Sequence, residues 1–304
     1  MRVLIVGGTR FVGRAIAEQL IRDGHDVSVL HRGQSEAAGV DGAVNLIADR
    51  EGDLAVLATG EWDATIDVSA YRPNHVTSLA RALGDRGGQH VFISTVSVYS
   101  SDIDPKSDET ARFTDVEVLR NVDTSTCEID NDAYGPLKVL CEQEVIANYT
   151  SPLIIRPTYV IGPYDYTMRF PAWVERLASG GTVPAPEPRA ATVQYIDARD
   201  LANFVARLTG ERRSGVFHTA APAVTFERML NEVKAAVAPE ATAIEWVVPE
   251  TDELGFDQFP LWSGRQSEPV LDVDPSAAIA AGLTFRSLSD SAVDTLAWLQ
   301  SKGD

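Results

Sequence analysis

The sequence predicts an α/β protein: a doubly wound parallel sheet with a smaller C-terminal lobe of mixed helices and strands. Two observations lead to this prediction. Short apolar runs alternate with helical patterns up to Gly162-Pro163, and the pattern then becomes irregular without a low-complexity linker. We therefore expect one domain from residues 1–163, with residues 191–221 returning to it, and a lobe from residues 164–190 and 222–304.

The first 32 residues predict a βαβ unit built around a glycine turn. The apolar run Val3-Leu4-Ile5-Val6 is typical of a buried parallel strand, and glycines follow it at once. Apolar residues then recur at helical spacing until Gly24, and a second apolar strand ends at His31-Arg32. A helix that begins behind glycines offers its N-terminus to phosphate, so the turn is a candidate dinucleotide-binding loop. Its residues are Gly7-Gly8-Thr9-Arg10-Phe11-Val12-Gly13.

The rest of the first domain repeats the alternation. A long polar segment, residues 100–132, interrupts it, and a segment of that length inside a domain is usually functional or mobile. Further strands are predicted at residues 44–47, 65–68, 90–94 and 153–156. Helices are predicted at residues 53–57, from Pro73 to Leu83, and from near Tyr134 to about Tyr149.

The sequence pattern of the C-terminal lobe is less regular than that of the first domain. The pair Gly180-Gly181 and the prolines at positions 184, 186 and 188 predict a loop. Helices are predicted at residues 171–177, 200–208, 226–237 and 289–299, and strands at residues 193–196 and 216–218.

Ligands of a doubly wound sheet bind beyond the carboxyl ends of its strands. Several polar or small residues follow predicted strands and so lie at this edge. They are His31 and Arg32, Asp49, Ser69 and Ala70, and Thr95.

Tyr134 and Lys138 are four residues apart on a predicted helix, so their side chains share a face. A nearby ammonium favours the phenolate and lowers the pKa of a tyrosine from about 10. Such a tyrosine can exchange a proton with a carbonyl or alcohol oxygen, and the lysine can also hold a ribose hydroxyl. A surface pair on an amphipathic helix is the alternative.

Composition restricts the function. A net charge of −18 and a pI near 4.6 oppose binding to nucleic acid over a broad surface. Two cysteines give no disulfide framework, and the five histidines show no metal-ligand spacing, so no metal is expected. No apolar run is long enough to span a membrane. We expect a soluble cytoplasmic protein that binds a small molecule.

Together these motifs resemble the extended, epimerase/dehydratase-like branch of the short-chain dehydrogenase/reductase superfamily. The glycine turn is similar to its G-x-x-G-x-x-G loop, with Arg10 in place of the middle glycine. Thr95 to Tyr99 is similar to [ST]-x-x-V-Y, and Tyr134 to Lys138 to Y-G-x-x-K. Arg156-Pro157 with Gly162-Pro163, and the segment from Tyr195 to Ala202, also match segments of this branch. The resemblance covers residues 1 to about 221.

The resemblance implies a Rossmann fold and an NAD(P)(H)-dependent oxidoreductase that acts on an alcohol/carbonyl pair. Tyr134 would exchange the proton, Lys138 would assist it and hold the ribose, and Thr95 would orient the oxygen. The same residues also serve epimerases and dehydratases with tightly held cofactor. A non-catalytic dinucleotide-sensing or RNA-binding protein is a third alternative, because the G-G-T-R-F turn also resembles that of chloroplast stem-loop RNA-binding proteins. The oligomeric state stays open, with a homodimer among the states allowed.

The resemblance also implies which residues bind cofactor. They are the seven residues of the glycine turn, His31, Arg32, Asp49 (at the adenine), Ser69, Ala70, Tyr134 and Lys138. An acidic residue at the end of the second strand would favour NAD, but His31 and Arg32 stand there. Arginine suits a 2′-phosphate, and Arg10 could assist, so NADP is expected ahead of NAD.

Nucleotide-sugar members differ from this chain at two positions. They often carry an asparagine where Thr158 and Tyr159 stand, and an arginine where Ala191 stands. An aromatic stretch from Tyr159 to Trp173 could line a pocket for a less charged substrate, or simply belong to the core.

Overall fold

A seven-stranded parallel sheet forms the centre of the molecule, as seen in the computed structural model, which describes residues 1–34, 39–252, 255, 258–265 and 268–302. The strand order is β11-β6-β5-β4-β1-β2-β3, so the chain winds outward in both directions from β1. This confirms the doubly wound fold class. The strands are β1 (Arg2–Val6), β2 (Asp26–His31), β3 (Val44–Ile47), β4 (Ala64–Asp67), β5 (Gln89–Ile93), β6 (Leu153–Pro157) and β11 (Gly215–Thr219).

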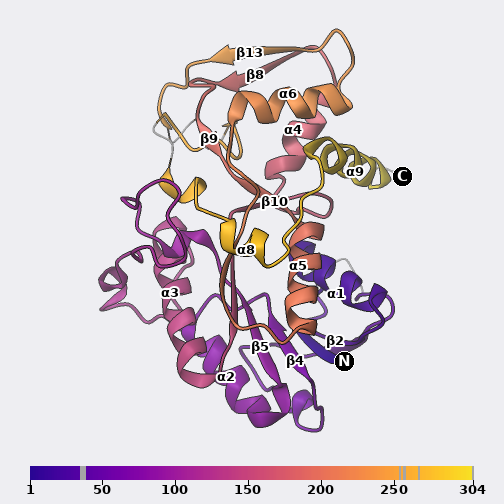
Figure 1. Ribbon diagram of the computed structural model, residues 1–304, viewed down its shortest axis with the longest axis vertical. Helices are drawn as coiled ribbons and strands as arrows, with labels where there is room; N and C mark the ends of the chain where they lie inside the picture. The colour runs from indigo at the N-terminus through magenta and orange to yellow at the C-terminus, as the bar shows by residue number, and fades with distance from the viewer. Residues whose placement is uncertain (35–38, 253–254, 256–257, 266–267, 303–304) are drawn as a thin grey trace.

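Helices cover both faces of this sheet (Figure 1). Helices α1 (Phe11–Arg22) and α5 (Ala198–Gly210) pack together on one face, and α2 (Pro73–Leu83) and α3 (Asn131–Asn148) on the other. The alternation along β1 explains why both layers are needed. Val3 and Ile5 enter the core beneath α1 and α5, whereas Leu4 and Val6 pack with the apolar side chains of α2.

Helix α3 begins three residues before Tyr134, earlier than predicted. The side chain of Asp130 accepts a hydrogen bond from the backbone N–H of Ala133 at 2.8 Å and so caps the helix. The polar segment before it carries one short 3₁₀ turn, η4 (Val116–Leu119).

A second group of elements lies at the other end of the molecule (Figure 1). Its core forms around Trp173, Phe226 and Met229, which come from helices α4 (Arg169–Ala178) and α6 (Phe226–Val237). Helix α9 (Leu288–Ser301) packs against both. The remaining short elements around the sheet are η1 (Ala55–Leu57), η2 (Gly84–Gly87) and η3 (Val96–Val98), and those later in the chain are β7 (Tyr159–Ile161), β8 (Thr182–Pro186), β9 (Thr192–Val193), β10 (Tyr195–Asp197), β12 (Val224–Thr225), β13 (Ala243–Val247), η5 (Pro269–Leu271) and α8 (Ser276–Ala280).

The proline-rich segment is a strand, so the predicted loop was wrong there. Strand β8 pairs in parallel with β13. Backbone N–H groups alternate in direction along a strand, and the N–H of Glu187 donates to the carbonyl of Val247 on β13 at 2.7 Å. Pro184 and Pro186 stand at the alternate positions, whose backbone faces away from β13. Proline is tolerated on an edge strand at such positions, because no ladder hydrogen bond is lost.

The strand predicted at residues 193–196 is divided at Gln194. Its residues before this point pair with β12 and those after it with β7. The Gln194 side chain is fully buried, donates to the carbonyl of Val273 at 2.9 Å and accepts from its N–H at 3.0 Å. In the described part of the chain, no helix is long and apolar enough to cross a membrane.

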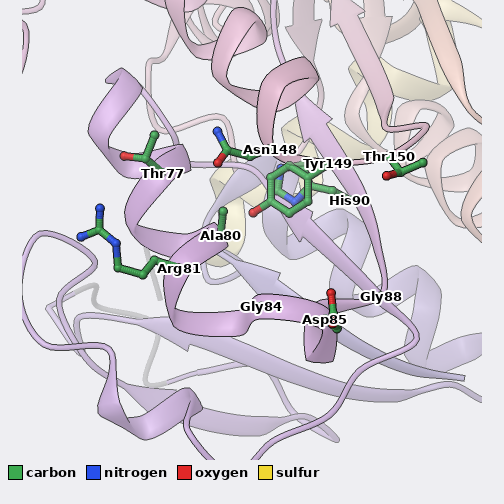
Figure 2. A pocket seen from close by; sticks show the side chains of 10 residues that line it. All are labelled: Thr77, Ala80, Arg81, Gly84, Asp85, Gly88, His90, Asn148, Tyr149 and Thr150. Carbon is green, nitrogen blue, oxygen red and sulfur yellow. The ribbon is translucent and has the colours of Figure 1, made fainter.

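A cavity of about 570 Å³ lies at the amino end of β5, between the ends of α2 and α3. Figure 2 shows the rings of His90 and Tyr149 together in its wall. The rings stack with centroids 3.8 Å apart, and neither His90 nitrogen has a hydrogen-bond partner among the described residues. Burial lowers the pKa of His90 to about 4, so the folded protein holds this imidazole neutral.

Protonation of His90 in the unfolded chain should make stability depend on pH. Its folded pKa lies below its unfolded value, so stability is lost as pH falls through the interval between them. Between about pH 7 and about pH 5.5 this histidine alone should cost the folded state about 1 kcal/mol. Chemical denaturation at the two pH values should show that His90→Phe, which keeps a ring on Tyr149, loses less stability than wild type. An identical loss in both proteins would contradict the assignment.

Candidate active site

The glycine turn after β1 has little space for any side chain. Gly7 has φ +88°, and a Cβ there would lie 2.6 Å from the Cβ of Ser69. A Cβ on Gly8 would lie 2.8 Å from Val29. A Cβ on Gly13 would lie 2.2 Å from the carbonyl oxygen of Gly7, so α1 packs directly on the turn.

The N-terminus of α1 is left open for an anion. Arg10 precedes the helix in an extended conformation, no side chain caps the first turn, and no acidic residue stands in it. The positive end of the helix dipole is therefore uncompensated. Thr9 and Phe11 are buried beside it, and Val12 packs on the core under α1.

The carboxyl ends of β2 and β3 lie on one side of this turn. His31 is buried; its Nδ1 accepts from the N–H of Gly33 at 3.1 Å, while Nε2 has no partner among the residues that the structure describes. Arg32 and Asp49 are exposed. A buried nitrogen without a partner and an exposed arginine at the second strand suit a ribose and its substituents.

A buried ion pair supports this edge from below, and the sequence analysis missed it. Arg50 binds both carboxylate oxygens of Asp67 at 2.7 and 2.8 Å, the hydroxyl of Ser69 at 2.9 Å and the carbonyl of His75 at 3.0 Å. Asp67 is fully buried, and the Arg50 guanidinium helps to hold the pKa of its carboxyl low against the effect of burial. A charged residue in the last position of an otherwise apolar strand was the available signal.

Thr95 and Tyr134 meet at the carboxyl end of β5. Thr95 begins the turn η3, where its hydroxyl accepts from the N–H of Ser97 at 3.1 Å. The Thr95 O–H donates to the hydroxyl of Ser97 at 3.1 Å, and Thr95 lies close enough to Tyr134 to influence the pKa of its phenol. The ring of Tyr71, from the segment after β4, lies 6.4 Å from that of Tyr134.

Lys138 is buried below Tyr134 on α3. Its ammonium donates to the carbonyl of Ala70, in the segment after β4, at 2.9 Å and to that of Ile93, the last residue of β5, at 2.8 Å. It also lies 4.1 Å from the centre of the Phe92 ring. Burial lowers the pKa of Lys138 to about 8.

The expected lowering of the Tyr134 pKa by Lys138 is not what this arrangement produces. Burial raises the pKa of Tyr134, and the neighbouring hydroxyl of Thr95 opposes the rise. The cation that opposes it is Arg169, at the start of α4, because Lys138 is directed to two backbone carbonyls instead. Sequence reasoning missed Arg169, which lies outside the motifs.

Arg10 also lies differently from expectation. Its guanidinium covers the ring of Tyr166 at 3.9 Å. Tyr166 in turn is close enough to Tyr71 and Tyr134 to influence both phenols. Arg10 therefore lies against Tyr166, and Arg32 is the arginine that remains at the end of the second strand.

A buried polar network holds the segments around Thr95 in place. Arg156 of β6 binds Glu142 of α3 through two hydrogen bonds of 2.9 and 2.6 Å, and donates to the Tyr99 hydroxyl at 2.6 Å. The Tyr99 hydroxyl also lies 2.6 Å from Nε2 of His218 on β11. Because every member has a partner, the network fixes α3 relative to β6 and to the turn after β5.

The model of the NAD dependent epimerase/dehydratase family matches residues 3–219. The chain belongs to this family.

The proteins that this chain resembles in sequence are named for different activities. It is 26% identical to the chloroplast stem-loop binding protein of 41 kDa b of Arabidopsis thaliana, over 93% of this chain and 77% of the relative. It is also 26% identical to the 2-alkyl-3-oxoalkanoate reductase of Stenotrophomonas maltophilia, over 68% of this chain and 65% of the relative. The solved structure of UDP-glucose 4-epimerase of Thermus thermophilus in complex with NAD shares the fold, with a TM-score of 0.70, 16% identity and 99% of each chain covered.

This epimerase/dehydratase-family protein is therefore an NAD(P)-dependent enzyme of the short-chain dehydrogenase/reductase superfamily. The residues present fit such a cofactor. The cradle around Gly7 and Gly13 admits no side chain, the N-terminus of α1 is uncompensated, and Nε2 of His31 lacks a partner in the described part of the chain.

Replacement of Gly13 should test the cradle. Gly13→Ala places a methyl group against the carbonyl of Gly7, so the turn must shift. We expect NAD(P)(H) to bind at least about tenfold more weakly, as measured by fluorescence titration. Gly210→Ala is the matched control, because nothing lies within 4 Å of its added Cβ. Unchanged affinity in Gly13→Ala would show that cofactor binds elsewhere.

Proposed function

We propose that this enzyme reduces a carbonyl group of a small molecule and uses NADP(H) that exchanges between turnovers. The observation that carries the proposal is the state of Tyr134. Burial raises its pKa, so the phenol keeps its proton at neutral pH. A protonated phenol beside the hydroxyl of Thr95 is suited to donate a proton to a carbonyl oxygen.

Thr95 and Lys138 would have separate roles in the reaction. Thr95 orients the oxygen that Tyr134 protonates. Lys138 has three N–H donors and gives two of them to Ala70 and Ile93, which leaves one for a ribose hydroxyl. When bound, the nicotinamide supplies the hydride.

Two residues support a substrate other than a nucleotide sugar. Ala191, at the place of the expected anchoring arginine, is buried. Nearby Arg189 is paired with Glu187 at 2.8 Å and lies 3.5 Å from Glu227, so it is already neutralised. The relative named as a 2-alkyl-3-oxoalkanoate reductase also supports the reduction of an oxo group.

Catalysis has more support than RNA binding. Tyr134 and Lys138 are both present on one helix, Lys138 buried and Tyr134 half-buried, and the net charge of −18 opposes attraction to a phosphate backbone. We also propose that residues 1–163 and 191–221 hold the cofactor, and that residues 164–190 and 222–304 shape the substrate pocket.

The preference for NADP rests on Arg32. It is exposed directly after β2, where an NAD-preferring site carries an acidic residue. A guanidinium suits a 2′-phosphate through its charge and its fork of donors. Asp49, at the end of β3, would contact the adenine.

Removal of the phenol should abolish reduction and spare cofactor binding. Tyr134→Phe keeps the ring, so turnover of NADPH with a panel of carbonyl compounds should fall at least about a hundredfold, with NADPH affinity nearly unchanged. Because the pKa of Tyr134 is raised, the wild-type rate should stay level through neutral pH and decline only in alkali.

Cofactor stoichiometry distinguishes the reductase from an epimerase. Freshly purified protein should release its cofactor on dialysis, and each product formed should consume one NADPH. Cofactor retained at one per chain, with substrate inverted and no net change in nicotinamide absorbance, would establish an epimerase. Full activity in Tyr134→Phe would refute the mechanism in either case.

The cofactor preference can be tested separately. Arg32→Ala should weaken NADPH binding about 10- to 100-fold, as expected for a lost charge-assisted hydrogen bond, and leave NADH binding unchanged. Arg213→Ala, another exposed arginine, controls for the general loss of positive charge. Tighter binding of NADH than NADPH to wild type would contradict the preference.

A further inference from the structure

The cavity at the amino end of β5 lies apart from the candidate active site. His90, in the wall of this cavity, is the second residue of β5, and Thr95 follows the carboxyl end of the same strand. An extended chain from one to the other spans about 16 Å. Ligands of a doubly wound sheet bind at its carboxyl edge, so neither the cofactor nor the substrate of the proposed reduction accounts for this cavity.

Three buried polar atoms in the cavity wall have no hydrogen-bond partner among the described residues. They are both ring nitrogens of His90, a residue that is 1% exposed, and the hydroxyl oxygen of Tyr149. Buried polar groups in folded proteins nearly always have a partner, so three exceptions in one wall need an explanation. A ligand that supplies the missing hydrogen bonds is such an explanation.

The fold holds these atoms in fixed positions. The rings of His90 and Tyr149 are nearly parallel, with an angle of 3° between their planes. His90 is fixed by the pairing of β5 with Thr65 of β4, and the N–H of Tyr149 donates to the carbonyl of Val145 at 3.1 Å where α3 ends. Figure 2 shows Tyr149 lying over His90, with its hydroxyl on the side of Ala80. The polar edges of both rings are therefore part of a built wall between α2 and α3.

The unpartnered atoms require a ligand that can both donate and accept hydrogen bonds. Because burial lowers the pKa of His90 to about 4, its imidazole is neutral, with one N–H donor and one acceptor nitrogen. The phenol of Tyr149 also donates and accepts. A hydroxyl group has the same two abilities, whereas a carboxylate only accepts and an ammonium only donates. Hydroxyl groups on the ligand therefore suit this wall best.

The rest of the lining favours an uncharged ligand. Arg81 and Asp85 are exposed there and have opposite charges, so a ligand with a single charge would meet one of its own sign. Thr77, Asn148 and Thr150 add side chains that both donate and accept. The volume of about 570 Å³ lies within the range of small-molecule sites, which is about 300–1,000 Å³.

We propose that this cavity binds a neutral polyhydroxylated molecule, a sugar or a cyclic polyol, whose hydroxyl groups form hydrogen bonds with the ring atoms of His90 and Tyr149. The site is separate from the candidate active site and does not depend on the reaction catalysed there. Neighbouring hydroxyl groups of one such molecule can satisfy the buried atoms of both rings and the polar side chains around them.

Neutral and charged compounds of similar shape test the proposal. D-glucose and myo-inositol are compared with gluconate and glucosamine in the presence of saturating NADP⁺, and the ring proton signals of the histidines are followed by NMR. His90→Phe identifies the signal of His90 among those of the five histidines. At least one neutral compound should shift this signal to saturation. The charged compounds should bind at least about fivefold more weakly.

Conservative variants test the contacts by calorimetry with the neutral compound that binds. Tyr149→Phe keeps the stacked ring and removes only the hydroxyl, so affinity should fall about five- to tenfold. His90→Phe keeps a ring under Tyr149 and should lower affinity at least about tenfold. Tyr195→Phe, which removes a phenol outside the cavity lining, is the matched control and should bind as wild type does. Thermal unfolding checks that each variant is folded.

Three results would overturn the proposal. The first is no shift of the His90 signal with any compound, which would leave water as the partner of the buried atoms. The second is tighter binding of a charged compound than of both neutral ones. The third is wild-type affinity in both Tyr149→Phe and His90→Phe. Tyr134→Phe should bind the neutral compound normally, and a loss in that variant alone would place the compound in the active site instead.

Discussion

The buried ammonium of Lys138 is the constraint on which the site depends. A charge removed from water is tolerated only where hydrogen bonds replace its hydration. Here the carbonyls of Ala70, in the segment after β4, and of Ile93, the last residue of β5, do so. Helix α3 is therefore positioned by the sheet edge, Tyr134 is carried one turn above that edge, and Thr95 follows Ile93 closely enough to meet it. The relative placement of Lys138, Tyr134 and Thr95 is a consequence of strand order.

Much of this architecture could be predicted because its signals are local. The apolar run before Gly7 and the helical spacing after it indicated the first βαβ unit, and the family match confirmed the resemblance drawn from the motifs. Pro73 at the first turn of α2 and the amphipathic pattern of residues 226–237 predicted both helices with the bounds observed. Each of these signals lies within one element and needs no information about its neighbours.

The features that could not be predicted depend on pairing between distant segments. Strand β8 exists because β13, far along the chain, supplies its hydrogen bonds, and its prolines favoured a loop when read alone. The prediction that Lys138 lowers the pKa of Tyr134 was wrong for the same reason. The spacing of the two residues predicted a lysine beside Tyr134, but only the fold shows that two backbone carbonyls bind its ammonium and that Arg169 is the cation that lowers the pKa of the phenol.

The prolines of β8 also affect how the molecule can meet other chains. An unpaired strand edge is a template on which an extended peptide or a second copy can add by backbone hydrogen bonds. β8 is paired with β13 on one side, and on the other Pro184 and Pro186 present no N–H at successive donor positions. A strand that approached this edge could donate hydrogen bonds to backbone carbonyls, but Pro184 and Pro186 have no N–H to donate in return. Pro184 and Pro186, which led the sequence analysis to predict a loop, thus disfavour the pairing of another strand with the edge of β8 that faces away from β13.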